Sequence, residues 1–162
     1  MRIGVIGDTH NNLRSVAHIV EIFQRHEIRR VIHTGDITQP KVLDRLSALS
    51  AEFVGVYGNN DLGERRELEL AADRCNMSFT EGPLELQWGG RRIVVVHDPR
   101  ELENCLTPEH DLALHGHTHL YRLESMGPTL VFNPGECAGM LKGHNRVGMV
   151  DLSNLKCEIE HF

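Results

Sequence analysis

Five short runs of apolar, mostly β-branched residues each lead into polar residues of the kinds that bind metal ions. The runs cover residues 2–6, 30–34, 53–57, 92–96 and 111–114. The polar residues that follow them are Asp8 and His10, then Asp36, Asn59 and His97, and finally His117 and His119. In an open α/β sheet, ligands bind at the strand ends. The pattern therefore predicts strands that place a polynuclear metal site at their ends.

The first half of the chain alternates these strands with helical stripes. A helix is expected over residues 12–27, with Asn11 or Asn12 as its cap, and Pro40 suits the first position of a second helix. A third, charged helix is expected through residues 64–74. The resulting β-α-β-α-β-α order predicts a parallel sheet with right-handed crossovers.

The second half is mostly strands, and antiparallel pairing is expected to dominate there. Gly89-Gly90 separates two strand patterns and predicts a hairpin. A short helix is expected over 101–106, and further strands over 120–126, 129–132, 146–152 and 155–161. The expected class is α+β with an α/β-type first half. Residues 1–162 would form a single domain of two packed sheets flanked by helices.

Composition narrows the classes of partner. The net charge is −6 and aromatic residues are few, which argues against a nucleic-acid-binding surface. No apolar run approaches the length of a membrane span. The four cysteines form no C-x-x-C pair and no secretory signal is visible, so a cytoplasmic protein with free thiols is expected. Assembly into a homo-oligomer stays open.

The seven candidate ligands form a mixed oxygen and nitrogen set. Such a set suits Mn, Fe, Zn, Ni or Co better than Ca or Mg. Seven ligands are too many for one tetrahedral ion, but they fit two ions that share one carboxylate. Two divalent ions, two carboxylates and a bridging hydroxide leave a charge of about +1, which favours an anionic substrate such as a phosphate ester.

Several motifs together resemble a known protein family. They are Asp8-Thr9-His10, Gly35-Asp36, Gly58-Asn59-Asn60-Asp61, His97 and Gly116-His117-Thr118-His119. In order and spacing they resemble the calcineurin-like metallophosphoesterases, and most of all the small bacterial and archaeal phosphodiesterases of that superfamily. Asn133-Pro134-Gly135 resembles a turn near the site of those small proteins. The resemblance implies a four-layer fold in which two mixed sheets form a β sandwich flanked by helices.

The resemblance also implies roles for the candidate ligands. One ion would be held by Asp8, His10 and His119, and the other by Asn59, His97 and His117. Asp36 would bridge the two ions, and the bridging hydroxide would be the nucleophile. Asp36, Asn59 and His117 would thus act in catalysis through that hydroxide. Two divalent ions are expected, manganese first, with nickel, iron, zinc or cobalt as alternatives.

Two positions depart from the family pattern. Many members carry a histidine that protonates the leaving group directly after the ligand asparagine, where this chain has Asn60. An amide is no general acid, so activated or cyclic phosphodiesters are the expected substrates. The second departure is Asp98, where glycine is common. Asp98 is expected to add negative charge beside the site and to orient His97.

The remaining candidates have supporting roles. Asp61 is expected behind the ligands rather than among them. His115 is expected to be structural, with protonation of the leaving group as the alternative. The other histidines are expected to be solvated or structurally hydrogen-bonded: His18, His26, His33, His110, His144 and His161. Cys137 is expected to be a small buried thiol.

The expected function is hydrolysis of a small phosphodiester by a dinuclear metal enzyme. Two alternatives stay open. One is a non-catalytic interaction scaffold, a role this fold has in the eukaryotic retromer complex. The other is a phosphomonoesterase or a nuclease that uses the same metal site. All seven ligand positions hold competent residues, which favours an enzyme over a scaffold.

Overall fold

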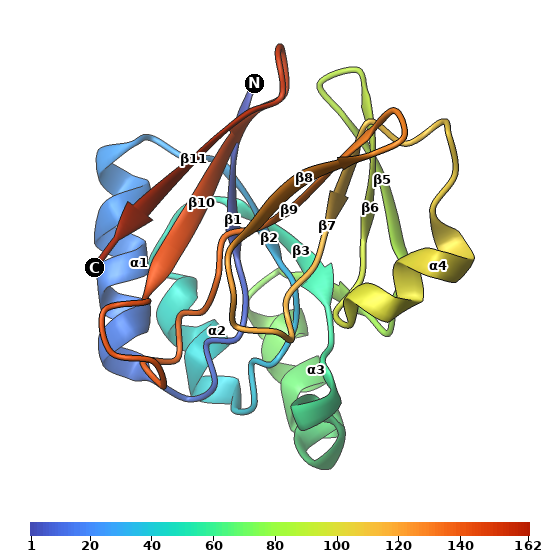
Figure 1. The fold of residues 1–162 in the computed structure, drawn as a ribbon. Helices are drawn as coiled ribbons and strands as arrows, with labels where there is room; N and C mark the ends of the chain where they lie inside the picture. Colours follow the sequence, from blue (N-terminus) through green and yellow to red (C-terminus); the bar gives the residue numbers. More distant parts are fainter.

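Two mixed β-sheets form the centre of the computed structural model, which describes residues 1–162 (Figure 1). The first sheet contains β1 (Arg2–Ile6), β2 (Arg30–His33), β3 (Glu52–Val56), β4 (Ser78–Thr80), β10 (Arg146–Asp151) and β11 (Lys156–His161). The second contains β5 (Leu84–Trp88), β6 (Arg91–Val95), β7 (Leu112–Leu114), β8 (Arg122–Met126) and β9 (Thr129–Asn133). Their strand orders are β11-β10-β1-β2-β3-β4 and β5-β6-β7-β9-β8. The expected class of two mixed sheets is confirmed.

The helices also follow the sequence pattern. They are α1 (Leu13–Arg25), α2 (Pro40–Leu46), α3 (Arg65–Arg74) and the short α4 (Leu102–Cys105), with 3₁₀ turns at Asn59–Glu64 and Pro99–Glu101. Asn12 caps α1, because its side chain accepts a hydrogen bond from the Ser15 amide at 3.1 Å. Pro40 takes the first position of α2, as predicted. None of these helices is long and apolar enough to cross a membrane.

Each sheet contains both parallel and antiparallel strand pairs. β1, β2 and β3 pair in parallel, as the alternating order predicts. The hairpin β5–β6 is antiparallel, but β7 pairs in parallel with both β6 and β9. The three-residue β4, which adds a parallel edge strand to β3, has too short a pattern to be predicted from the sequence.

The hydrophobic core has two main layers, and β1 contributes to both. Ile3 and Val5 of β1 lie in the layer between the two sheets, with residues of β6, β7 and β10. Ile6 lies in the other layer, where α1, α2 and α3 pack on the outer face of the six-stranded sheet. A strand buried on both faces has no polar alternation. This explains the continuous apolar run at residues 2–6.

A fully buried histidine at the end of β2 joins the loops that follow β1 and β2. The His33 Nε2 is 3.1 Å from Thr9 Oγ1, and its Nδ1 accepts a hydrogen bond from the Gly35 amide at 3.1 Å. Burial lowers the pKa of His33 to about 3. The side chain is therefore a neutral structural group, one of the two roles expected for it.

Close packing between β1 and α1 leads to a first prediction, for Gly4→Ala. A Cβ at Gly4 would lie 2.6 Å from the Cζ of the fully buried Phe23. Relieving this overlap requires a shift of packed groups, so the free energy of unfolding should fall by about 1–3 kcal/mol in urea titrations. Gly63→Ala is the control, because nothing lies within 4 Å of a Cβ there. Equal effects of the two substitutions would contradict this account.

The buried His33 leads to a second prediction, about pH. The depressed pKa means that between about pH 3 and 6.5 the unfolded chain binds a proton that the folded protein does not bind. The contribution of His33 to stability is therefore complete above pH 6.5 and is lost as the pH falls. From pH 6.5 to 5, the wild type should lose about 1.5 kcal/mol more unfolding free energy than His33→Asn. Parallel stability curves for the two proteins would rule this out.

Candidate metal centre

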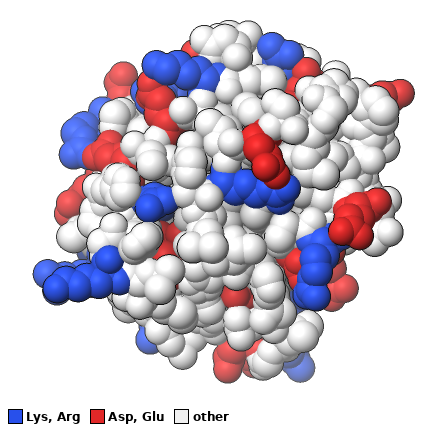
Figure 2. Space-filling view, viewed as in Figure 1, with Lys and Arg blue, Asp and Glu red and all other residues white.

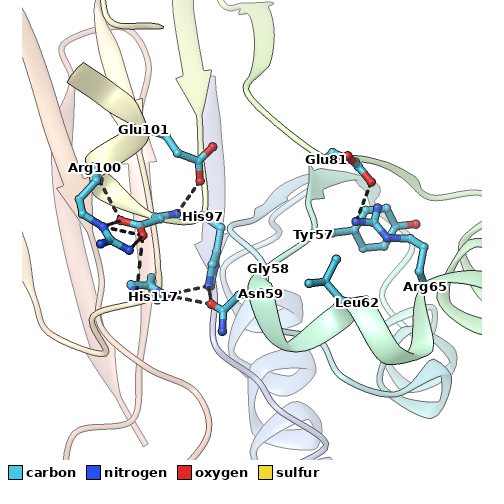
Figure 3. A pocket seen from close by; sticks show the side chains of 11 residues that line it. Tyr57, Gly58, Asn59, Leu62, Arg65, Glu81, His97, Arg100, Glu101 and His117 are labelled. Atoms are coloured by element: carbon cyan, nitrogen blue, oxygen red, sulfur yellow. Dashed lines mark hydrogen bonds and ion pairs between the residues drawn. The ribbon is translucent and has the colours of Figure 1, made fainter. Parts of the chain in front are cut away.

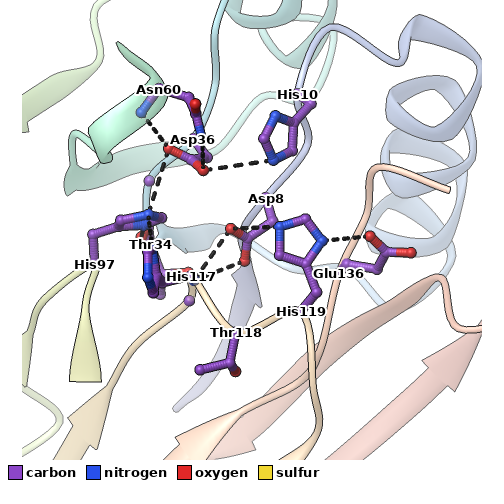
Figure 4. Close-up of polar contacts among 12 residues, drawn as sticks. Asp8, His10, Thr34, Asp36, Asn60, His97, His117, Thr118, His119 and Glu136 are labelled. Atoms are coloured by element: carbon purple, nitrogen blue, oxygen red, sulfur yellow. Dashed lines mark hydrogen bonds and ion pairs between the residues drawn. The ribbon is translucent and has the colours of Figure 1, made fainter. Parts of the chain in front are cut away.

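Five strand ends meet at one edge of the two sheets and carry all seven candidate ligands. Figure 4 labels these residues except Asn59, which is labelled in Figure 3. The carboxyl ends of β1, β2 and β3 contribute Asp8, His10, Asp36 and Asn59, and those of β6 and β7 contribute His97, His117 and His119. The sequence pattern predicted that these strand ends would meet. Packing of one sheet on the other brings the ends of β6 and β7 to those of β1, β2 and β3.

A first group of side chains consists of Asp8, His10 and His119, and Asp36 adjoins it. One ligand atom from each of these four residues lies within 4.8 Å of the others. The His119 Nε2 is 3.6 Å from Asp8 Oδ1, and the His10 Nε2 is 3.5 Å from Asp36 Oδ2. This compact set of carboxylate oxygens and imidazole nitrogens could hold a metal ion.

A second group consists of Asn59, His97 and His117. The Asn59 Oδ1 lies 3.0 Å from His97 Nε2 and 3.0 Å from His117 Nδ1, and these two nitrogens are 3.3 Å apart. The His97 Nε2 is also 3.4 Å from Asp36 Oδ1. The Asp36 carboxylate thus directs one oxygen to each group.

Burial gives these groups unfavourable charges and unsatisfied atoms when no cation is bound. Burial raises the pKa of Asp8 to about 7 and lowers the pKa of His10. The buried His10 Nε2 makes no hydrogen bond. An unpartnered imidazole nitrogen beside two buried carboxylates is the environment in which a divalent cation is favourable. The residues present therefore fit a metal ion.

Backbone conformation at the site is unusual. Five of the seven candidate ligands adopt positive φ angles, which non-glycine residues rarely do. The angles are 49° at Asp8, 40° at His10, 58° at Asp36, 67° at His117 and 60° at His119. Such strain persists only where the surrounding structure imposes it, and it concentrates at functional sites. The left-handed turns direct these side chains toward one another beyond the strand ends.

Asp61 and Asn60 hold the Asp36 loop in place. The buried Asp61 carboxylate accepts hydrogen bonds from the amides of Asp36 (3.0 Å), Thr38 (2.6 Å) and Gly58 (2.7 Å). Asn60 donates to both Asp36 oxygens, from its backbone amide at 3.0 Å and its side-chain Nδ2 at 2.7 Å. Asp61 therefore lies behind the candidate ligands, while Asn60 contacts Asp36 directly.

His97 is oriented by a backbone carbonyl rather than by Asp98, which corrects the sequence-based expectation. The His97 Nδ1 is 2.8 Å from Thr34 O. Asp98 caps the turn at Pro99–Glu101 through the Arg100 amide and pairs with the Arg100 guanidinium. Hydrogen bonding to Arg100 lowers the pKa of Asp98 to about 2. Its carboxylate is 3.8 Å from His117 Nε2, so its charge does lie beside the site.

His115 is buried with both ring nitrogens engaged. Its Nδ1 is 3.0 Å from Gly116 O and its Nε2 is 3.3 Å from Arg122 Nη1. Arginine only donates, so Nε2 accepts and Nδ1 donates to the carbonyl. Burial lowers the pKa of His115 to about 4. This neutral, enclosed imidazole is structural in character and is poorly suited to proton donation.

Glu136 is a residue of the site that the sequence reasoning missed. Its fully buried side chain places Oε2 2.6 Å from His119 Nδ1, while Oε1 accepts a hydrogen bond from the Leu141 amide at 2.5 Å. The only available signal was its position directly after Asn133-Pro134-Gly135, the turn that resembles one near the site of related proteins. Cys137, the next residue, is buried as expected, and burial raises the pKa of its thiol.

A pocket of about 520 Å³ adjoins the second group (Figure 3). It extends from Asn59, His97 and His117 to Tyr57, Leu62 and Arg65. The Arg65 guanidinium lies 3.7 Å from the centroid of the Tyr57 ring and pairs with Glu81 at 3.3 Å. Figure 2 shows one face of the molecule, on which acidic and basic side chains are interspersed without a basic stripe.

Comparisons with known proteins agree with this geometry. The family model described as a calcineurin-like phosphoesterase superfamily domain matches residues 1–155. The chain is 32% identical over 155 residues to the phosphodiesterase MJ0936 of Methanocaldococcus jannaschii, covering 93% of each protein. It is 24% identical to the phosphodiesterase YfcE of Escherichia coli, covering 93% of this chain and 88% of that protein.

Solved structures show the same fold. A structure described as a novel archaeal phosphodiesterase superposes with a TM-score of 0.91 at 28% identity, covering all of both chains. Vps29 of Entamoeba histolytica superposes with a TM-score of 0.69 at 20% identity over 100% of this chain and 99% of that one, which shows the fold alone. By the family match and the identity to MJ0936, this chain belongs to the calcineurin-like phosphoesterase superfamily and is homologous to its phosphodiesterases.

Proposed function

We propose that this protein is a dinuclear metal-dependent hydrolase of phosphodiester bonds. The observation that carries the proposal is the position of Asp36, whose two carboxylate oxygens face two separate groups of imidazoles. A shared carboxylate between two clusters of nitrogen and oxygen ligands is the arrangement that holds two ions close together. Identity to the phosphodiesterase MJ0936 supports the reaction class.

In this proposal each candidate ligand has one role. The first ion would be held by Asp8, His10 and His119, the second by Asn59, His97 and His117, and Asp36 would contribute to both positions. The mixed oxygen and nitrogen set suits manganese, nickel, iron, zinc and cobalt alike, and of these manganese is the ion proposed first. When bound, two such ions would supply a hydroxide nucleophile and neutralise charge on the phosphate.

The residues around the pocket support a phosphodiester as the substrate. Arg65 pairs with Glu81, and Arg100 pairs with Asp98, so nearby carboxylates partly offset both positive charges, which favours a singly charged diester over a doubly charged monoester. The pocket beside Asn59, His97 and His117 has room for one ester group of the substrate. No general acid stands at Asn60, whose side chain donates to Asp36. Activated or cyclic diesters, which need little leaving-group protonation, are therefore the proposed substrates.

The alternatives have less support. A non-catalytic scaffold does not require seven competent ligands, yet all seven lie together here. A nuclease that acts on long nucleic acids would benefit from a basic stripe, and the face in Figure 2 shows none.

Removal of the ligands tests the proposal directly. Asp36→Asn and His117→Ala should each lower turnover of bis-p-nitrophenyl phosphate by more than about 1000-fold, because each removes ion contacts worth several kcal/mol. Dialysis against a chelator should abolish turnover, and Mn²⁺ should restore it. His18→Ala on the exposed face of α1 is the control. Full activity of Asp36→Asn would refute the role of Asp36 between two ions.

The missing general acid gives a further prediction, for Asn60→His. An imidazole at this position should raise turnover of diesters with poor alkyl leaving groups by up to about 100-fold, and should change bis-p-nitrophenyl phosphate turnover little. The gain should decline above about pH 6.5, where the imidazole loses its proton. Asn60→Ala loses the same contact with Asp36 without adding an acid, so it should show no gain. An equal gain in both variants would argue against proton donation.

A further inference from the structure

The buried carboxylate of Glu136 has a single side-chain partner, His119. Its side chain is 0% exposed, and no lysine or arginine nitrogen lies within 4.0 Å of it. A buried carboxylate is costly unless hydrogen bonds satisfy it. An ionised carboxylate only accepts hydrogen bonds, so beside the Glu136 carboxylate the His119 Nδ1, 2.6 Å from Oε2, carries a proton and donates a hydrogen bond to it. The lone pair of the imidazole is then on Nε2, which faces Asp8 in the first group.

No histidine of the second group has an equivalent partner. The His97 Nδ1 faces a neutral backbone carbonyl, Thr34 O, at 2.8 Å. The His117 Nε2 has Asp98 nearby at 3.8 Å, beyond hydrogen-bond distance, and Arg100 offsets the charge of that carboxylate.

The two groups therefore differ in charge. The first group contains the Asp8 carboxylate and has the Glu136 carboxylate behind His119. The second group has the neutral amide of Asn59 in the corresponding place and shares only Asp36 with the first. A carboxylate behind a ligand histidine fixes its tautomer and increases its basicity toward a metal.

We propose that Glu136 is a positioning residue that holds His119 as an Nε2 ligand and makes the first group the tighter of two unequal metal positions. The inference rests on metal binding as proposed above, but not on the hydrolysis of any substrate. Two of the three ligands of the second group are open to solvent, since Asn59 is exposed and His117 is 36% exposed, although His97 is only 5% exposed. In the first group Asp8 is 0% and His119 19% exposed. The weaker position is thus the one beside the pocket.

Metal titration of the full chain tests this inequality. Metal-free protein titrated with Co²⁺, followed by calorimetry and visible absorption, should show one tight and one weak binding step. In Glu136→Gln, which keeps the size of the side chain but removes its charge, the tight step should weaken by about 10–100-fold and the weak step should stay unchanged. Unchanged dissociation constants for both steps would overturn the proposal.

The control is a second carboxylate–imidazole pair distant in the fold. Glu85 on β5 lies 2.8 Å from Nε2 of the buried His110, so Glu85→Gln removes an equivalent charge from a histidine outside the candidate centre. It should leave both binding steps unchanged. A matching loss in Glu85→Gln would show that the effect of Glu136→Gln is not specific to His119, and would overturn the proposal.

A purely structural role for Glu136 predicts different results. Because Oε1 also binds the Leu141 amide, the substitution could loosen the segment after Glu136, lowering the unfolding temperature and weakening both steps equally. That result would overturn the proposal. Long-range ¹H–¹⁵N spectra of the metal-free wild type give a readout that needs no variant. They should show His119 protonated at Nδ1 alone, and protonation at Nε2 instead would contradict the assignment.

Discussion

The arrangement of the site depends on the contacts of the buried Asp36 carboxylate with two histidines. One oxygen faces His10, and the other faces His97, which follows the end of β6 in the other sheet. The surrounding chain serves to hold this carboxylate: Asn60 donates to both oxygens, and Asp61 accepts from the Asp36 amide. Asp36 is the side chain that directs one oxygen to each cluster of ligands, and Asp8 adds a second link by accepting hydrogen bonds from the backbone amide of His117.

The electrostatics of the cluster is consistent with metal binding. Burial raises the pKa of Asp8 and leaves the His10 Nε2 without a hydrogen bond, so the centre by itself is unfavourable. Positive φ angles at Asp8, His10 and Asp36 add strain. A bound cation would offset the buried negative charge and would use the free nitrogen of His10. Strain and buried charge at one place indicate that function, rather than stability, has shaped this edge of the sheets.

Much of the fold was predictable because its signals are local. The helical stripe behind Asn12, Pro40 at the start of α2 and the Gly89-Gly90 hairpin are periodicity and turn signals that short segments carry by themselves. β4 was missed because three residues carry no period. Glu136 was missed because its contact with His119 forms only when the chain folds. Asp98 was wrongly expected to orient His97, because its carboxylate instead accepts a hydrogen bond from the Arg100 amide in the turn that follows it.

The sequence alone determined which side chains stand at the strand ends, and hence the chemistry available there. The position of a ligand in the sequence shows which strand it follows, as Asp8 and His10 follow β1. Only the tertiary structure decided which atoms face one another. The sandwich brings His97 to Asp36, left-handed turns aim the ligands, and a buried glutamate selects one nitrogen of His119. Contacts between distant segments depend on packing, which no local pattern encodes.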